Sequence, residues 1–297
     1  MQQIFFIGLG NMGMPMALNL LKNGYKVTGF DISPLKVKEF AALGGSTATT
    51  LAEAKTSQVG ITMLQTGTQV QEVCLNQAGE FNLLEPGALF IDCSTIDIAS
   101  SLKIKRAADA VQVAAIDAPV SGGVGGARLG SLTFMVGGET SIYTRAVPIL
   151  SAMGKQIIHA GNNSCGQAAK MCNNMILGIM MTAVSEAFSL ATKSGLTAQK
   201  FHEIATKASG QCWVMDNYVP VPDVLPDAPA NHDYAPPAFT VAMMLKDLSL
   251  SQEAAGRCNV NTPMGALACK LYDNLAKDGY KDKDCSVIFK WLNKFKE

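Results

Sequence analysis

Gly8-Leu9-Gly10-Asn11-Met12-Gly13 is the stretch that decides the fold, because of what stands on either side of it. An apolar, strand-like run, Gln3 to Ile7, precedes it, and a helix-like segment follows it to about Asn23, before Gly24. In such a motif the first glycine permits a tight turn, the second lets the backbone approach a ligand, and the third allows close helix packing. The helix N-terminus then presents N–H groups to an anion such as a pyrophosphate. The stretch therefore predicts the first unit of a dinucleotide-binding sheet.

Asp31 supports this interpretation, because it directly follows the second predicted strand, Lys26 to Phe30. A carboxylate at this point of a dinucleotide-binding unit accepts hydrogen bonds from the ribose hydroxyls of NAD, whereas NADP needs cationic groups there. Ile32, Ser33 and Pro34 offer no cation. The pattern favours NAD; the alternative is that Asp31 only caps a helix that begins near Ser33.

Short apolar runs alternate with helix-like segments up to about Asn162, which is typical of a parallel sheet with helices on both faces. After Gly166, long segments with helical spacing replace them. We predict an α/β fold, with a Rossmann-type doubly wound parallel sheet in residues 1–162 and an all-α domain in residues 163–297. The predicted strands are Gln3–Ile7, Lys26–Phe30, Val59–Leu64, Ala88–Asp92, Val113–Asp117, Leu132–Val136 and Gln156–His159.

The second domain is expected to contain a long spine helix, Gln167 to Ser194, which is apolar on nearly every side and is therefore expected to be buried and to pack against the first domain. Its polar residues Asn173, Asn174, Ser185 and Glu186 argue against a membrane span. Between further helices lies Gln211 to Pro237, with six of the twelve prolines. Its aromatic residues favour an ordered, packed loop. The other helices are expected at Ala198–Ala208, Val241–Cys258 and Pro263–Lys277, and the aromatic residues are Trp213, Tyr218 and Tyr234.

Composition narrows the possible partners. The chain has 297 residues, with 24 Lys plus Arg and 24 Asp plus Glu, and no basic stripe that would neutralise phosphates, so we expect no nucleic-acid partner. The eight cysteines and three histidines lack metal-site spacing, so we expect no metal and reduced thiols. A strand-like run so near Met1 leaves no room for a leader. The expected location is cytoplasmic, or the mitochondrial matrix if a transit peptide has been removed.

A glycine-rich stretch, Asp117 to Ala127, follows the fifth predicted strand and carries one hydroxyl, Ser121. Ligands bind at the carboxyl ends of the strands in open parallel sheets. The N–H groups of Gly122 and Gly123, with Ser121 Oγ, would suit a substrate carboxylate. The alternative is a flexible turn.

Two lysines are candidates for chemistry. Lys170 and Asn174 stand four residues apart at the start of the long apolar helix, so both side chains emerge on one face. Burial lowers the pKa of a lysine, which would suit Lys170 to exchange a proton with an alcohol. Lys246 also emerges from apolar neighbours and would reach a substrate carboxylate or the cofactor. The alternatives are a lysine whose stem packs while its amine reaches water, for Lys170, and a solvated helix face, for Lys246.

Four motifs in this order make the whole chain resemble the β-hydroxyacid dehydrogenase family. Gly8 to Ala17 is similar to its cofactor motif, and Asp117 to Gly138 to its substrate motif. Gly166 to Asn174 is similar to its catalytic motif, and Lys246-Asp-Leu to its final signature. Ser209 to Trp213, Tyr218 to Pro222 and Gly279 to Asp284 resemble the members that act in valine degradation, rather than tartronate semialdehyde reductases.

The resemblance implies NAD-dependent oxidation of 3-hydroxyisobutyrate to methylmalonate semialdehyde. It makes Lys170 the general acid/base, Asn174 a residue that orients the substrate, and Ser121, Gly122 and Gly123 the carboxylate site. Lys246 would lie close to both ligands. The cofactor would be lined by Gly8, Leu9, Gly10, Asn11, Met12, Gly13, Asp31, Leu64, Gln65, Gln69, Thr95 and Lys246. Family members are commonly homodimers or homotetramers.

Three positions depart from the family pattern: Gln65 stands where proline is usual, Pro236-Pro237 replace a small flexible pair, and Cys285 replaces an aromatic. These departures affect the predicted ligand affinity and the identity of the substrate more than the predicted type of reaction. Two alternatives stay open: a tartronate or succinate semialdehyde reductase that uses NADPH, and a catalytically silent NAD-binding protein. The joint presence of Lys170, Asn174 and Ser121 speaks against the silent protein.

Overall fold

The computed structural model describes residues 2–76, 79, 81 and 83–294, and the chain divides into two compact units, Met1–Lys170 and Met171–Glu297. Within the described residues, the first unit forms one sheet in the order β3-β2-β1-β4-β5-β6-β8-β7, with β9 paired to β8. The strands are β1 (Gln3–Ile7), β2 (Lys26–Phe30), β3 (Ser46–Thr47), β4 (Val59–Thr62), β5 (Leu89–Asp92), β6 (Ala114–Asp117), β7 (Val120–Ser121), β8 (Leu132–Gly137) and β9 (Gly154–Gly161).

The register of the sheet aligns the carboxyl ends of its parallel strands. Ile7 at the end of β1 pairs with Phe30 of β2 and with Thr62 of β4. Thr62 pairs in turn with Asp92 of β5, and Asp92 with Asp117 of β6. The segments that follow these strands therefore start at one edge of the sheet, where open parallel sheets bind their ligands.

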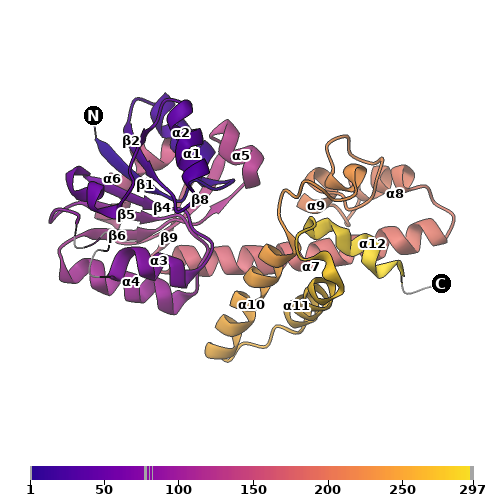
Figure 1. Cartoon of the computed structure of the whole chain (residues 1–297). Helices are drawn as coiled ribbons and strands as arrows, with labels where there is room; N and C mark the ends of the chain where they lie inside the picture. Colours follow the sequence, from indigo (N-terminus) through magenta and orange to yellow (C-terminus); the bar gives the residue numbers. More distant parts are fainter. Residues whose placement is uncertain (1, 77–78, 80, 82, 295–297) are drawn as a thin grey trace. The chain divides into compact units, whose positions relative to one another are not determined.

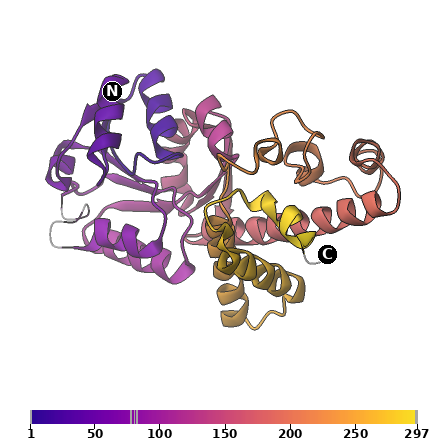
Figure 2. The ribbon, with the colours of Figure 1, turned by 45° about the vertical axis from the view of Figure 1, so that its right-hand side comes forward.

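Helices cover both faces of the sheet in the first unit (Figures 1 and 2). Ile4 and Phe6 of β1 are buried together with apolar residues of α1 (Gly13–Lys22), α5 (Gly123–Leu129) and α6 (Thr140–Ser151). On the other face, Phe90 is buried with residues of α3 (Gly67–Leu75) and α4 (Ile98–Ala110). Helix α2 (Pro34–Ala42) belongs to the first face, because its Phe40 is buried together with Ile4 and Phe6. This is the predicted doubly wound sheet.

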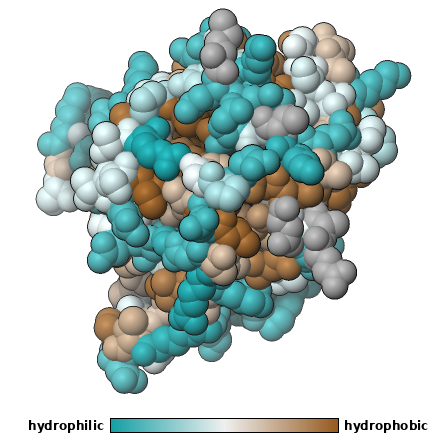
Figure 3. All heavy atoms as spheres, turned by 90° about the vertical axis from the view of Figure 1, so that its left-hand side faces the viewer, coloured by the Kyte–Doolittle hydropathy of each residue, from teal (hydrophilic) through white to brown (hydrophobic). Residues whose placement is uncertain are grey.

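The outer surface of these helices is mostly polar. In Figure 3, hydrophilic side chains (teal) spread over the face that is drawn, and hydrophobic atoms (brown) show largely in the hollows between them. An amphipathic helix buries one apolar stripe and turns its polar side to solvent.

All seven predicted strands are present, with ends that differ by up to two residues. Two strands were not expected, β3 and β7, each of only two residues. A segment this short has no period that a sequence pattern can reveal. Each exists because a neighbour in space, β2 or β8, offers a free edge for pairing.

The second unit is helical, as predicted. Its helices are the greater part of α7 (Cys165–Lys193), α8 (Ala198–Ala205), α9 (Trp213–Asn217), α10 (Val241–Arg257), α11 (Pro263–Leu275) and α12 (Ile288–Leu292). A π-helical turn, Ala276–Tyr280, continues α11. Within the described residues 171–294, the only β pairing is an isolated bridge between Thr240 and Asp284.

The prediction that α7 is buried on every side is wrong. Met181 and Phe188 are fully buried, but Ile176 is 53% exposed and Leu190 is 71% exposed. A helix that is apolar all round does not reveal which stripe the core uses, and neighbours cover only part of this one. By length and composition α7 is also apolar enough to cross a membrane, with 39% of its most apolar window buried. Core helices pass the same test, so this is weak evidence for a membrane span.

The proline-rich segment from Gln211 to Pro237 is ordered around Asp284, which is fully buried. The Asp284 carboxylate accepts hydrogen bonds from Tyr218 Oη at 2.7 Å and from Ser286 Oγ at 2.5 Å. Tyr218 and Tyr234 are buried, in agreement with the predicted packed loop, and Trp213 is 51% exposed. The rings of Trp213 and Tyr218 form a T-shaped contact, with 5.9 Å between their centroids.

Candidate active site

The three glycines of the first motif differ in the space around them. Gly8 has a φ of +98°, and a Cβ placed on it would lie 2.4 Å from Met63 O. A Cβ on Gly13 would lie 1.8 Å from Gly8 O. A Cβ on Gly10 would meet nothing within 4 Å. Gly8 and Gly13 are therefore required by the turn itself, whereas Gly10 faces open space, so its role beside a pyrophosphate stays a prediction.

Asp31 contacts the same motif. Its Oδ2 accepts a hydrogen bond from Leu9 N at 2.7 Å, and its Oδ1 accepts one from Ser33 N at 2.8 Å. A carboxylate offers about four lone-pair positions, so these two bonds leave acceptor capacity for ribose hydroxyls. Asp31 thus joins the turn after β1 to the turn after β2, and its carboxylate is half-buried at the edge where a dinucleotide would lie.

The turns after β4 and β5 are tied together by side-chain hydrogen bonds. Asp92 Oδ1 accepts bonds from Thr62 Oγ1 at 2.8 Å and from Ser94 N at 3.0 Å. Ser94 Oγ accepts a bond from Leu64 N at 2.9 Å. Leu64 and Thr95 are half-buried, so both candidate cofactor residues stand on turns with fixed backbones.

Gln69 has a local structural role besides its predicted contact with the cofactor. Its Oε1 accepts hydrogen bonds from Gln65 N at 3.1 Å and from Thr66 N at 3.3 Å, while Thr66 Oγ1 accepts one from Gln69 N. This is a capping box at the start of α3. Gln65, in the turn between β4 and α3, is exposed.

The glycine-rich stretch after β6 is not the loop that the sequence pattern indicated. Ser121 lies in β7, opposite Thr133 of β8, and Gly122 has a φ of +128°. Helix α5 begins at Gly123, because the sharp turn at Gly122 frees the following residues for helical hydrogen bonds such as Gly126 N to Gly122 O. Gly122 and Gly123 stand at the start of α5, whose first N–H groups have no acceptor within the helix, and the binding of a carboxylate by Ser121, Gly122 and Gly123 stays a prediction.

Asp117, at the end of β6, anchors the first turn of α7. Its carboxylate accepts hydrogen bonds from Ser164 N at 2.6 Å and from Gln167 N at 2.8 Å. Burial raises the pKa of Asp117 to about 6, although these two N–H donors act in the opposite direction. Gly137 and Gly166 have no room for a side chain, because a Cβ on either would lie within 2.7 Å of this carboxylate.

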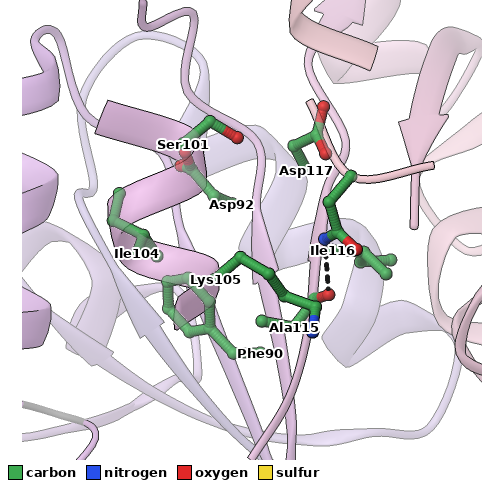
Figure 4. A pocket seen from close by; sticks show the side chains of 9 residues that line it. Phe90, Asp92, Ser101, Ile104, Lys105, Ala115, Ile116 and Asp117 are labelled. Atoms are coloured by element: carbon green, nitrogen blue, oxygen red, sulfur yellow. Dashed lines mark hydrogen bonds between the residues drawn. The ribbon is translucent and has the colours of Figure 1, made fainter. Parts of the chain in front are cut away.

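A small cavity with polar and apolar walls lies beside this anchor (Figure 4). Its volume is about 10 Å³, close to the least that holds one water molecule. Asp92 and Asp117 line it from neighbouring strands, together with Ser101 of α4 and Asn163. Asn163 Nδ2 donates to Ala115 O at 3.0 Å, the dashed line in the figure. The cavity is too small for a substrate.

Lys170 is the sixth residue of α7 and only 8% exposed. A lysine is rarely buried to this degree unless its amine is engaged. Lys170 follows the anchored turn at Ser164 to Gln167, so the position of its backbone is set by the same contacts that fix the start of the helix.

In the second unit, Asn174 and Lys246 meet at Asp247. Asn174 Nδ2 donates to Asp247 Oδ2 at 2.5 Å, and Lys246 Nζ lies 3.1 Å from Asp247 Oδ1. The second pair is close enough for an ion pair but not aligned as a hydrogen bond. Asp247 is 2% exposed and was not selected from the sequence. The only signal for it was a carboxylate next to Lys246 in an apolar segment.

The predicted site residues thus form two groups. Gly8 to Gly13, Asp31, Leu64, Gln65, Gln69, Thr95 and Ser121 to Gly123 follow strands at the carboxyl edge of the first unit's sheet, with Lys170 on the helix anchored to Asp117. Asn174 and Lys246 are held together by Asp247 in the second unit. His159 and His202 each contact a backbone carbonyl, Gly138 O and Met215 O.

Comparison with protein-family models matches both halves of the chain. Residues 3–161 match the NAD binding domain of 6-phosphogluconate dehydrogenase. Residues 164–292 match a domain described as NAD-binding of NADP-dependent 3-hydroxyisobutyrate dehydrogenase.

Individual relatives are similar over nearly the full length. An NAD-dependent L-serine dehydrogenase of Pseudomonas aeruginosa is 44% identical over 98% of this chain and 97% of its own. A 3-hydroxyisobutyrate dehydrogenase of the same organism is 44% identical over 92% of this chain and 91% of its own. The solved structure of Mycobacterium tuberculosis 3-hydroxyisobutyrate dehydrogenase with L-serine has a TM-score of 0.91 and 41% identity, and the match covers 98% of this chain and 99% of that one.

Proposed function

The chain belongs to the β-hydroxyacid dehydrogenase family and uses NAD, and from this premise we propose that it oxidises a short 3-hydroxy acid, with 3-hydroxyisobutyrate as the first candidate. The product would be methylmalonate semialdehyde. The observation that supports this most is the burial of Lys170, a residue only 8% exposed, in a chain whose Gly10 leaves open space for a pyrophosphate. A general acid/base and a dinucleotide site are the two parts that alcohol oxidation needs.

In the proposed reaction, NAD supplies the hydride acceptor at its nicotinamide ring. The Lys170 amine accepts the hydroxyl proton of the substrate as the carbonyl forms. The first turn of α5, with Ser121 Oγ, binds the carboxylate through N–H groups that lack helical acceptors. Gly8 to Gly13 hold the pyrophosphate, and Asp31 accepts bonds from the ribose. The protein contributes position and proton transfer.

In the second unit, Asn174 orients the substrate and Lys246 attracts its negative charge in this proposal. Asp247 keeps both side chains in place, because it accepts a hydrogen bond from Asn174 and forms an ion pair with Lys246. An uncompensated buried carboxylate is costly, so Asp247 also requires these partners.

L-Serine is a second candidate substrate. A relative that is 44% identical carries the name NAD-dependent L-serine dehydrogenase, and the solved relative with a TM-score of 0.91 is described with L-serine. Both molecules carry a carboxylate and a hydroxyl on the third carbon. They differ at the second carbon, which bears a methyl group in one and an ammonium in the other.

Steady-state kinetics with both acids would test the proposal. We expect NAD-dependent oxidation of 3-hydroxyisobutyrate with a higher specificity constant than that of L-serine, measured by NADH absorbance. A higher specificity constant for L-serine would make L-serine the preferred substrate instead. Turnover only in the reverse direction, with NADPH and tartronate or succinate semialdehyde, would replace the proposal by a reductase. No turnover of any of these compounds would refute the assigned reaction.

A further inference from the structure

Gln167 joins the start of α7 to the turn after β5. Its side chain is fully buried. Nε2 donates a hydrogen bond to Ser94 O at 2.8 Å, and Oε1 accepts one from Ile96 N at 3.1 Å. The two bonds stand on either side of Thr95, so the amide holds the backbone of this residue much as a neighbouring strand would.

The backbone of Gln167 is fixed as well. Its N–H donates to Asp117 Oδ2 at 2.8 Å, and Ser164 N donates to the other oxygen of that carboxylate at 2.6 Å. Ser164 Oγ donates further to Ser101 Oγ of α4 at 3.1 Å. The first turn of α7 is therefore attached to β6, to α4 and to the turn that carries Thr95.

Lys170 follows Gln167 by three residues, so the two side chains lie one helical turn apart on neighbouring positions of the helix surface. Any rotation or shift of this turn would move the Lys170 amine. Because the Gln167 amide binds the backbone on both sides of Thr95, the same shift would disturb the turn after β5. These contacts lie within the first compact unit.

We propose that Gln167 is a positioning residue that holds the Thr95 turn and the Lys170 turn at a fixed separation. This rests on the proposed function, in which Lys170 takes the hydroxyl proton, and on the place beside the cofactor that the family resemblance implies for Thr95. The separation of these two turns then sets the distance between the hydride acceptor and the proton acceptor. A displacement of about 1 Å is enough to reduce turnover by about a hundredfold.

Glutamine is the side chain that fits this task. Its planar amide presents one donor and one acceptor at the same distance from the backbone, which matches one carbonyl and one N–H of an extended segment. Glutamate has the length but, when ionised, lacks the donor for Ser94 O. Methionine has a similar length and neither function, so it would leave both buried backbone groups without partners.

The test compares Gln167→Met with a matched control, Asn163→Ala. Asn163 also uses its side-chain amide near the start of α7, but its bond goes to Ala115 O of β6 and not to the Thr95 turn. We expect Gln167→Met to lower kcat at least tenfold with KM for the hydroxy acid within threefold of wild type. We also expect a Kd for NAD at least threefold higher, and a larger kinetic isotope effect with substrate deuterated at the carbinol carbon. Asn163→Ala should change each quantity by less than threefold.

Other outcomes separate the two proposals. If wild type turns over no hydroxy acid, the proposed function is refuted, and equal NAD affinity in the two variants would then refute the role of Gln167. If wild type is active and Gln167→Met only lowers the melting temperature, with kcat, isotope effect and NAD affinity unchanged, Gln167 is merely structural. Should Gln167→Met not fold, Gln167→Glu keeps the length and the acceptor for Ile96 N, and the same kcat and NAD criteria apply to it.

Discussion

Gly10 and Gly13 stand three residues apart in one turn, yet their replacement by alanine should affect different properties of the protein. A Cβ on Gly13 would lie 1.8 Å from Gly8 O, whereas a Cβ on Gly10 would meet no protein atom within 4 Å. The φ of Gly10 is not positive, so alanine can adopt its backbone conformation. Gly13→Ala should therefore destabilise the first unit, and Gly10→Ala should instead weaken NAD binding.

The size of the effect at Gly13 follows from the contact. The approach of 1.8 Å is more than 1 Å short of the 3.0 Å below which real Cβ atoms essentially never come, and the obstacle is backbone. Overpacking of this kind costs about 3 kcal/mol at the upper end of the usual range. The higher helix propensity of alanine offsets about 1 kcal/mol of this. A net loss of about 2 kcal/mol lowers the melting temperature by roughly 4–8 °C in a unit of this size.

Thermal unfolding without ligand, followed by circular dichroism, measures the first effect, and quenching of intrinsic fluorescence by NAD measures the second. Gly10→Ala should melt within about 2 °C of wild type, since the change in packing is small. Its Kd for NAD should rise at least about tenfold, which corresponds to 1.4 kcal/mol of binding free energy. Equal melting temperatures for the two variants would refute the packing argument. Wild-type NAD affinity in Gly10→Ala would refute the assignment of the open space to the pyrophosphate.

Three further changes test other parts of the site. Lys170→Ala should lower kcat at least about a hundredfold, because a general acid/base is lost, while NAD affinity measured by fluorescence stays near wild type; unchanged turnover would remove Lys170 from the chemistry. Asp31→Ala should weaken NAD more than NADP, since only NAD offers a free 2′-hydroxyl to the carboxylate; equal weakening in binding titrations would leave Asp31 only its bonds to Leu9 and Ser33. Asp117 has its pKa raised from 3.8 to about 6 in the folded chain, so the folded state binds this proton more tightly than the unfolded state does. Its contribution to stability is therefore complete below about pH 4 and is lost as the pH rises through 6, a change of about 3 kcal/mol. Urea unfolding of Asp117→Asn and wild type at pH 4.5 and 7.5 tests this. The free energy of unfolding of Asp117→Asn, relative to that of wild type, should be higher at pH 7.5 than at pH 4.5. A difference between the two proteins that does not depend on pH would contradict the raised pKa.

The sequence alone determined those features that depend on neighbours along the chain. The strand Gln3–Ile7, the turn Gly8 to Gly13 and the following helix appear as expected, because a short continuous apolar run, glycines at fixed spacing and a helical period are all local signals. Asp31 was identified in the same way from its place after β2. The resemblance to a dehydrogenase family also rested on short contiguous motifs.

Only the tertiary structure decided which distant groups meet. Gln167 reaches Ser94 and Ile96 over more than seventy residues, and Asp247 reaches Asn174 over 73. A single sequence carries no pattern for such pairs, because the partner of a buried polar group is set by packing in space. The exposed side of α7 could not be predicted for the same reason. Apolar residues around a helix show that burial is favourable, but not on which side neighbouring residues will cover the helix. The helix at Gly123 likewise depended on the turn at Gly122 and the pairing of β7 with β8, so a glycine-rich segment that is flexible by composition became regular in its surroundings.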